Sequence, residues 1–312
     1  MITTEKYTPD ISDEWNAFVA DSKNGTFLHD RRYLDYHADR FADCSTVFRF
    51  QNAIVALLPA NRVGDVIHSH QGLTYGGLIV SETMKASLML DIVDALVQHL
   101  GSLGLKSLSY TPSPHIYHRY PAEEDIYALY HRGATLVQRD ALSVVRPQWH
   151  PPLQARRQRG LKKAIKAGLI FAESDDWASF WYLLEDTLKR RHDSSPVHTL
   201  NEIDQLRRSF PNNIRLYICS DSTNLVAGTV IFESNQVAKT QYIASSETGR
   251  VTGALDLIFT TLLDSTYWEK DFLDFGSSHQ GEDRDLAIGL IEQKEGFGAR
   301  SIVQDTYQLK IN

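Results

Sequence analysis

In the second half of the chain, the spacing of apolar positions changes from the period of a strand to that of a helix. Three short runs of alternating residues, separated by polar turns, predict three consecutive strands: 214–220, 225–234 and 237–245. Four apolar residues then recur with the i, i+3, i+4 and i+7 spacing of one helix face: Leu255, Ile258, Phe259 and Leu262. The pattern therefore predicts a strand, a turn and a helix between Thr240 and Leu263.

The turn before this helix combines residues that favour anion binding. Thr252 is a candidate N-cap, and Gly249 and Gly253 allow another backbone or a ligand to approach closely. The first amides of a helix have no intrahelical partner and lie at the positive end of its dipole. We therefore expect an anion site at this turn.

Other patterns place elements on both sides of this turn. In the second half they predict further strands and helices: strands 169–174, 272–278 and 301–311, and helices 153–168, 175–192, 199–210 and 285–299. In the first half they predict a hairpin and a long helix: strands 46–51 and 53–63, and helix 84–101. Three prolines at 147, 151 and 152 end the first half, so we expect domains 1–150 and 151–312.

The helix predicted at 153–168 is strongly amphipathic. Its apolar face is formed by Leu161, Ala164, Ile165 and Gly168, and its basic face by Arg156, Arg159, Lys163 and Lys166, with Lys162 between them. One interpretation is a solvated face of a connecting helix. The other is an electrostatic contact with a phosphorylated ligand, because Arg and Lys pair with phosphate oxygens.

Composition narrows the classes of protein to consider. The 312 residues carry a net charge of −7, which argues against broad binding to nucleic acid or anionic membranes. The two cysteines, Cys44 and Cys219, lack metal-ligand spacing, so we expect neither a disulfide nor a metal site. The sequence shows neither an apolar leader nor a membrane-spanning run, and we expect a cytoplasmic protein.

Three motifs resemble those of known acyltransferases. Arg250-Val251-Thr252-Gly253 follows a strand and resembles the R-x-x-G turn of the GNAT acyltransferases, although Leu255 departs from that pattern. Near the end, the sequence IEQKEGFGA is similar to a second GNAT pattern at its Lys, Gly and Phe, whereas Glu292 replaces the tyrosine that often protonates the leaving thiolate. RRQRGLKKAIKAGLIF resembles a segment of the Fem-type acyltransferases, which carry two GNAT-like domains.

The resemblance implies an α+β (mixed α/β) fold with two tandem GNAT-like domains, each a mostly antiparallel sheet flanked by helices. It also implies that the second domain binds the acyl donor, acetyl-CoA, without a metal. The residues implied for donor binding lie in the strand and turn predicted after Thr240: Gln241, Tyr242, Ile243, Arg250, Val251, Thr252, Gly253 and Ala254.

Candidate catalytic and acceptor-binding residues lie outside the turn. His192 and His198 flank a loop between two helices and are candidate bases, and the resemblance implies that Asp274 lies near the acyl end. Histidine and aromatic residues in first-half loops are suited to sugar recognition, and with two cations of the basic helix they form the predicted acceptor site: His70, Tyr75, His115, Tyr117, His118, Arg119, Arg159 and Lys163.

Three functions remain open from the sequence. The first is an acetyl-CoA-dependent N-acyltransferase that acts on an amino sugar or a nucleotide-linked amino sugar in cell-surface polysaccharide biosynthesis. The second keeps the fold but takes aminoacyl-tRNA as the donor, as the Fem resemblance also implies. The third is a non-catalytic binding protein with the same fold, which the departures at Leu255 and Glu292 favour.

Overall fold

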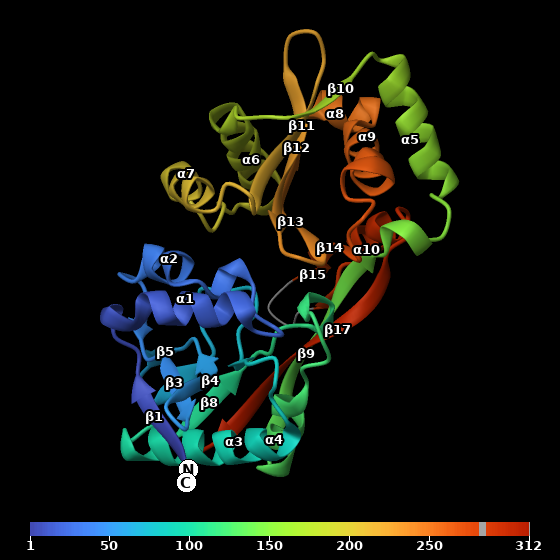
Figure 1. Cartoon of the computed structure of the whole chain (residues 1–312). Helices are drawn as coiled ribbons and strands as arrows, with labels where there is room; N and C mark the ends of the chain where they lie inside the picture. The colour runs from blue at the N-terminus through green and yellow to red at the C-terminus, as the bar shows by residue number, and fades with distance from the viewer. Residues whose placement is uncertain (281–284, 312) are drawn as a thin grey trace. The chain divides into compact units, whose positions relative to one another are not determined.

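The computed structural model describes residues 1–280 and 285–311, except the side chains of His37, His192 and Gln280 (Figure 1). The chain divides into two compact units. The first unit comprises Met1–Asp140 and Val303–Asn312, and the second comprises Ala141–Ile302. The sequence instead predicts domains 1–150 and 151–312, so the two divisions differ in where they place the last strand.

The second unit contains the three predicted consecutive strands. They are β11 (Ile214–Ser220), β12 (Leu225–Glu233) and β13 (Val237–Ser245), paired antiparallel as neighbours along the chain. The other strands of its main sheet lie outside them in the order β10-β11-β12-β13-β14-β9: β10 (Ile170–Glu173), β14 (Phe272–Ser277) and β9 (Thr135–Val145). Two short strands, β15 (His279–Gln280) and β16 (Asp285–Leu286), pair separately.

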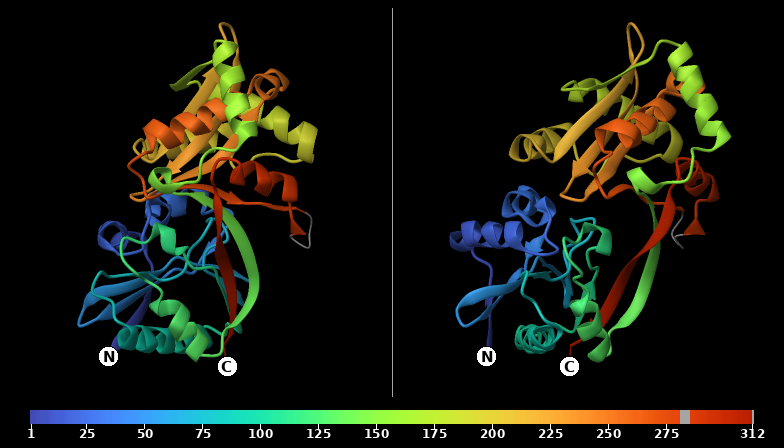
Figure 2. Two further views of the ribbon diagram at one scale, coloured as in Figure 1. Left: turned by 90° about the vertical axis from the view of Figure 1, so that its right-hand side faces the viewer. Right: turned by 45° about the vertical axis from the view of Figure 1, so that its right-hand side comes forward.

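Helices cover both faces of this sheet (Figures 1 and 2). One face carries α6 (Trp177–His192) and α7 (Leu200–Ser209), and Thr199 and Glu202 form the capping box of α7. The other carries α5 (Ala155–Lys166) and α9 (Ala254–Thr261), which pack against each other. The remaining elements of the unit are short: the 3₁₀ turn η5 (Pro147–Trp149), α8 (Glu247–Thr252), the π-helical turn η6 (Leu262–Thr266) and α10 (Ile288–Glu295).

The first unit has two sheets. One has the order β1-β3-β4-β7: β1 (Ile2–Lys6), β3 (Thr46–Phe50), β4 (Ala53–Leu58) and β7 (Ile79–Val80). The other has the order β17-β8-β6-β5-β2: β17 (Arg300–Lys310), β8 (Ser107–Tyr110), β6 (Val66–His68), β5 (Asn61–Val63) and β2 (Ala42–Asp43). Gln51 and Asn52 both have positive φ and close the predicted β3–β4 hairpin.

Its helices are α1 (Ser12–Asp21), α2 (Arg31–Leu34), α3 (Ala86–Ser102) and α4 (Glu124–His131). Short 3₁₀ turns complete it: η1 (Pro9–Ile11), η2 (Phe27–His29), η3 (Asp35–His37) and η4 (His115–Tyr117). The helix predicted at 84–101 is α3, and its residues Ile92, Leu96 and Leu100 are fully buried in the core. The mixed α/β class with mostly antiparallel strands is confirmed.

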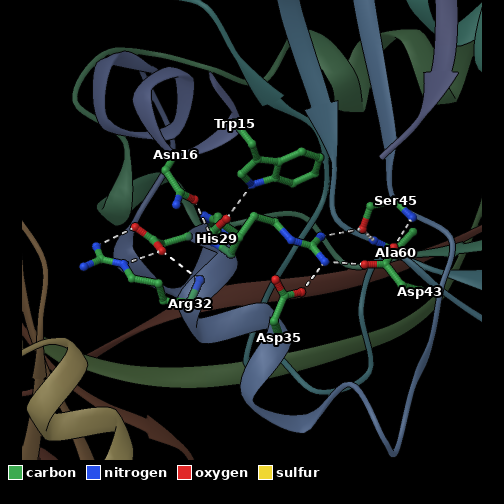
Figure 3. A network of polar contacts seen from close by, with 10 residues as sticks. Trp15, Asn16, His29, Arg32, Asp35, Asp43, Ser45 and Ala60 are labelled. Carbon is green, nitrogen blue, oxygen red and sulfur yellow. Dashed lines mark hydrogen bonds and ion pairs between the residues drawn. The ribbon is translucent and has the colours of Figure 1, made fainter. Parts of the chain in front are cut away.

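A buried arginine organises the α1–α2 region of this unit. Arg31 is 3% exposed, forms ion pairs with Asp35 and Asp43, and stacks 3.6 Å from the ring centroid of Tyr7. Figure 3 shows this network, in which Trp15 donates a hydrogen bond to the carbonyl oxygen of His29. Because the buried guanidinium of Arg31 is paired with two carboxylates, this cluster stabilises the fold of the α1–α2 region.

Candidate active site

The third of the consecutive strands, β13, separates from its neighbour β14 partway along its length. The two pair in parallel only from Val237 to Lys239. On its other side, the pairing with β12 shifts by one residue, and Gln241 is the extra residue of a β-bulge. A bulge bends a strand and changes the direction of its side chains. The second half of β13 is therefore not paired with β14.

The turn after β13 is helical. Ser246 is the N-cap of α8, since its hydroxyl accepts a hydrogen bond from the Gly249 amide at 3.0 Å. The expectation that Thr252 is the cap is wrong, because the Thr252 hydroxyl donates back to the carbonyl oxygen of Thr248 within α8. Gly253, with φ of +82°, ends α8 and precedes α9.

Helix α5 lies directly against this junction. A Cβ atom at Gly253 would lie 2.3 Å from the carbonyl oxygen of Gly160, and one at Gly160 would lie 1.9 Å from a carboxylate oxygen of Asp256. On the buried side of α5, Arg157 donates a hydrogen bond from Nη1 to Asp256 at 2.8 Å. The apolar face predicted for this helix is wrong at Ile165, which is 64% exposed. Helix packing therefore explains the glycine at 253.

A pocket of about 670 Å³ opens beside the junction, within the second unit. It is lined by residues of α5, α6, β13, α8, α9 and α10, and it carries six basic side chains and one acidic side chain, Asp256: Arg156, Arg157, Arg159, Lys163, Arg191 and Arg250. Among the described residues, no ion pair involves Arg156, Arg159, Lys163 or Arg191. The pocket therefore presents unneutralised positive charge to an anion, in a chain whose net charge is −7.

The predicted donor-binding residues divide between this pocket and its surroundings. Those that line it are Ile243, Arg250, Val251 and Gly253. Arg250 also forms an ion pair with Glu247 and donates to the carbonyl oxygen of Ser245 at 3.1 Å. The others are not among its lining residues: Gln241, Tyr242, Thr252 and Ala254. Two residues predicted for the acceptor, Arg159 and Lys163, line this pocket instead.

A second polar cluster lies where β13 and β14 separate. Asp274 is 1% exposed, and Lys239 lies 3.4 Å from its carboxylate. Lys294, from α10, donates hydrogen bonds to the carbonyl oxygens of Gly276 at 3.0 Å and Ser277 at 2.7 Å. Burial lowers the pKa of Lys294 to about 8, while the nearby Asp274 opposes that shift. This group is an ammonium at neutral pH in a largely dry environment.

Of the two candidate histidine bases, His198 lies beside β13. It is 4% exposed, and its Nδ1 lies 2.5 Å from the phenol oxygen of Tyr242. Burial raises the pKa of Tyr242 to about 12. His192 is the last residue of α6, and its side chain lies outside the described residues. His198 and Tyr242 therefore form a pair that their separate sequence signals did not predict.

The first-half residues predicted to bind the acceptor differ in exposure. Tyr75 and Tyr117 are 2% and 3% exposed with ring centroids 4.5 Å apart, so their faces contact each other in the core. Burial lowers the pKa of His118 to about 4, and its Nε2 lies 2.9 Å from the carbonyl oxygen of Ser113. His70 is also buried. Of the six, His115 and Arg119 are exposed, and His118 is intermediate in exposure.

Several residues of these clusters carry weak sequence signals. Arg157 shares a helix face with Leu161 and Ala164, and a charged residue on an apolar face indicates a buried partner. Its partner Asp256 lies 99 residues away. Lys239 lies within a strand and Arg191 at the end of a helix, where neither position is unusual for a solvated charge. No group of three His, Cys, Asp or Glu side chains that could bind a metal occurs among the described residues.

Comparison with known proteins identifies the fold. No family model and no curated protein matches the sequence. Solved structures do: FemX has a TM-score of 0.69 at 10% identity, covering 99% of this chain and 98% of that one. The structure of L-PGS from Bacillus licheniformis has a TM-score of 0.62 at 14% identity, and the match covers 97% of this chain and 92% of that one. A tandem GNAT protein from the clavulanic acid biosynthesis pathway has a TM-score of 0.52 at 12% identity, and the match covers 100% of this chain and 99% of that one.

These similarities confirm the predicted tandem GNAT fold, shared with FemX. At these identities they show the fold and leave the reaction to the residues of this chain. Within the part of the chain that the structure describes, none of the helices combines the length and the apolar character that crossing a bilayer requires.

Proposed function

We propose that this chain, which has the tandem GNAT fold, is an N-acyltransferase that binds a phosphate-bearing acyl donor in the basic pocket of its second unit. The donor is acetyl-CoA, and the acceptor is the amino group of an amino sugar or a nucleotide-linked amino sugar. The observation that carries this proposal is the pocket itself, in which six basic residues and one acidic residue surround about 670 Å³.

The lining residues fit a ligand with a charged part and an apolar part. Arg159 and Lys163 of α5 and Arg191 of α6 supply charges for phosphate oxygens. Ile243 and Ala244, on the half of β13 that is not paired with β14, line the same pocket. An extended carrier arm along this strand would meet backbone hydrogen-bonding groups as well as apolar side chains.

Lys294 is suited to stabilise the charge that develops during acyl transfer. Two of its three N–H donors reach the carbonyl oxygens of Gly276 and Ser277. In this proposal the third donates to the oxyanion of a tetrahedral intermediate, and the buried position makes its charge more effective. In this proposal Asp274 acts through Lys239 and Lys294 as a positioning residue rather than as the base.

The acceptor side of the proposal rests on fewer residues. His115 and Arg119 are exposed residues of the first unit, and their part in acceptor recognition stays a prediction from the sequence. We place the reaction in the cytoplasm, since Cys44 and Cys219 are free thiols.

A mass-spectrometric screen tests this function. Purified protein is incubated with nucleotide amino sugars and several acyl-CoAs, and products heavier by one acyl group are sought. The proposal expects at least one acylated amine, formed by the wild type and reduced at least tenfold by Arg159→Ala. An absence of any acylated product, together with an absence of acetyl-CoA binding, would contradict it.

The second donor class predicted from the sequence, aminoacyl-tRNA, stays a prediction. Helix α5 also carries Lys162 and Lys166, for which no ion pair is found within the described residues, so positive charge extends along the helix beyond the pocket. A longer polyanion such as aminoacyl-tRNA would use this additional charge. Comparing product formation with acetyl-CoA and with charged tRNA separates the two donors.

A further inference from the structure

The pair formed by Tyr242 and His198 has a geometry suited to proton transfer. The phenol oxygen lies 2.5 Å from His198 Nδ1 and 3.3 Å from the His198 backbone nitrogen. Burial raises the pKa of Tyr242 to about 12, so the phenol keeps its proton at neutral pH. When Nδ1 carries no proton, the phenol donates to Nδ1, while the backbone N–H of His198 donates to the phenol oxygen.

Three elements hold this pair in position. The edge of the Trp181 ring, from α6, lies against Tyr242, with ring centroids 5.2 Å apart and an interplanar angle of 74°. The Phe232 ring of β12 lies 6.5 Å from the His198 ring. His198 immediately precedes Thr199, the N-cap of α7. The hydrogen bond thus joins the α6–α7 connection to the sheet.

The pair also lies at the place where the sheet opens. Tyr242 follows Gln241, the bulge residue of β13, and precedes Ile243, which lines the basic pocket. Helix α6 supplies Trp181 to the pair and Arg191 to the pocket, so one helix borders both sites. Of the two partners, Tyr242 is half-buried and His198 is 4% exposed, so the tyrosine is the more exposed of the pair.

The reaction proposed for this fold needs a group that moves a proton from the amine to the leaving group. The tyrosine that often protonates the thiolate in GNAT proteins is replaced here by Glu292. The base and the acid must therefore come from other residues.

We propose that Tyr242 and His198 act as a proton relay in acyl transfer, with Tyr242 as the catalytic residue that touches the amine and His198 as the buried base behind it. This inference rests on the proposed acyltransferase function and adds the route of the proton. It differs from a single histidine base because the side chain that reaches the substrate is the phenol.

The steps of this relay balance. As the amine nitrogen forms its bond to the thioester carbonyl carbon, the amine proton passes to the phenol oxygen and the phenol proton passes to Nδ1, giving an imidazolium. The carbon–sulfur bond then breaks, and the proton returns along the same route to the thiolate. The products are the amide and the thiol, with the pair restored. No phenolate accumulates, because one proton arrives as the other leaves.

Gln241 has a defined place in this scheme. Burial raises the pKa of Tyr242, and the neighbouring Gln241 side chain lowers it by a smaller amount. The bulge allows this side chain to lie beside Tyr242, its neighbour in sequence.

A Tyr242→Phe variant tests the relay because it removes one oxygen and retains the ring packed against Trp181. The matched control is Tyr182→Phe, which alters an exposed tyrosine of α6. With the acceptor found by the product screen, we expect Tyr242→Phe to lower kcat about 100-fold, with KM for the donor and acetyl-CoA affinity within twofold of the wild type. Tyr182→Phe is expected to retain wild-type kcat.

A kcat within threefold of wild type for Tyr242→Phe overturns the relay and leaves the acyltransferase function intact. A wild type without any acyl transfer overturns both. The NMR signals of ¹⁵N-labelled histidine rings add a readout that needs no substrate. We expect His198 to be unprotonated at Nδ1 and protonated at Nε2 in the wild type, and a proton resident on Nδ1 of the neutral ring overturns the relay.

Discussion

A Cβ atom at Gly253 would lie 2.3 Å from the carbonyl oxygen of Gly160. This close approach joins the α8–α9 junction to helix α5 and brings the basic face of α5 beside the end of β13. The glycine that the sequence predicts as a point of contact with a carrier is therefore in contact with another helix. The carrier site that we propose is formed by the side chains around that contact.

Replacing Gly253 by alanine tests this packing. The residue has φ of +82°, and the new methyl group would overlap the Gly160 carbonyl. Gly168→Ala is the matched control, since Gly168 has φ of +69° with no atom within 4 Å of its Cβ position. We expect urea denaturation to show Gly253→Ala less stable than Gly168→Ala by about 1–3 kcal/mol. Equal losses would contradict the close approach.

The Arg157–Asp256 ion pair makes a second prediction. Both side chains are largely buried, so Asp256→Leu leaves an uncompensated guanidinium and is expected to cost about 3–5 kcal/mol. The double variant Arg157→Met with Asp256→Leu removes both charges and should lose less than the single variant. Arg139–Asp305, in which the arginine is exposed, is the control, and breaking it is expected to lower stability much less. A double variant as unstable as the single one would refute this account.

Lys294 predicts a pH dependence of stability. Its folded pKa of about 8 lies below the ordinary value of 10.5, so between these values the unfolded chain binds more protons and stability rises with pH. Compared with Lys294→Met, the wild type should gain up to about 3 kcal/mol between pH 7.5 and pH 10. Urea denaturation at both pH values measures this gain. A constant difference would mean that Lys294 is not desolvated.

Asp125 predicts the opposite slope in the first unit. Burial raises its folded pKa to about 6, while it accepts a hydrogen bond from Tyr110. Stability due to this group is present below its unfolded pKa of 3.8 and is lost as the pH rises through 6. Asp125→Asn keeps an acceptor for Tyr110 but does not titrate. The wild type should therefore gain about 2 kcal/mol over this variant from pH 7.5 to pH 4.5. If the stabilities of the wild type and Asp125→Asn changed with pH in parallel, the raised pKa of Asp125 would be contradicted.

Local patterns in the sequence predicted much of the second unit. The strands β11, β12 and β13 have the predicted starting residues, because short polar turns separate clear alternating runs. The basic face of α5 also followed from its periodicity. These features depend on spacing within one element, which the sequence displays directly.

Contacts between distant segments could not be predicted in this way. Gly160 and Gly253 meet only because α5 packs on α9, and Ile165 is exposed for the same reason. Tyr75 and Tyr117 look like loop aromatics in the sequence, yet their rings bury each other. The Tyr242–His198 pair joins a strand to a loop 44 positions away, and the residues next to each partner in the sequence do not indicate the other.

The most direct test of the central claim is the affinity of the protein for acetyl-CoA, measured by isothermal titration calorimetry. We expect the wild type to bind, with Arg159→Ala and Lys163→Ala each weakening the affinity about tenfold, because each removes a charge from the pocket lining. Lys162→Ala changes the same helix outside that lining and should stay within about twofold of the wild type. A wild type that does not bind acetyl-CoA, or an equal effect of all three substitutions, would contradict the assignment of this pocket as the donor site.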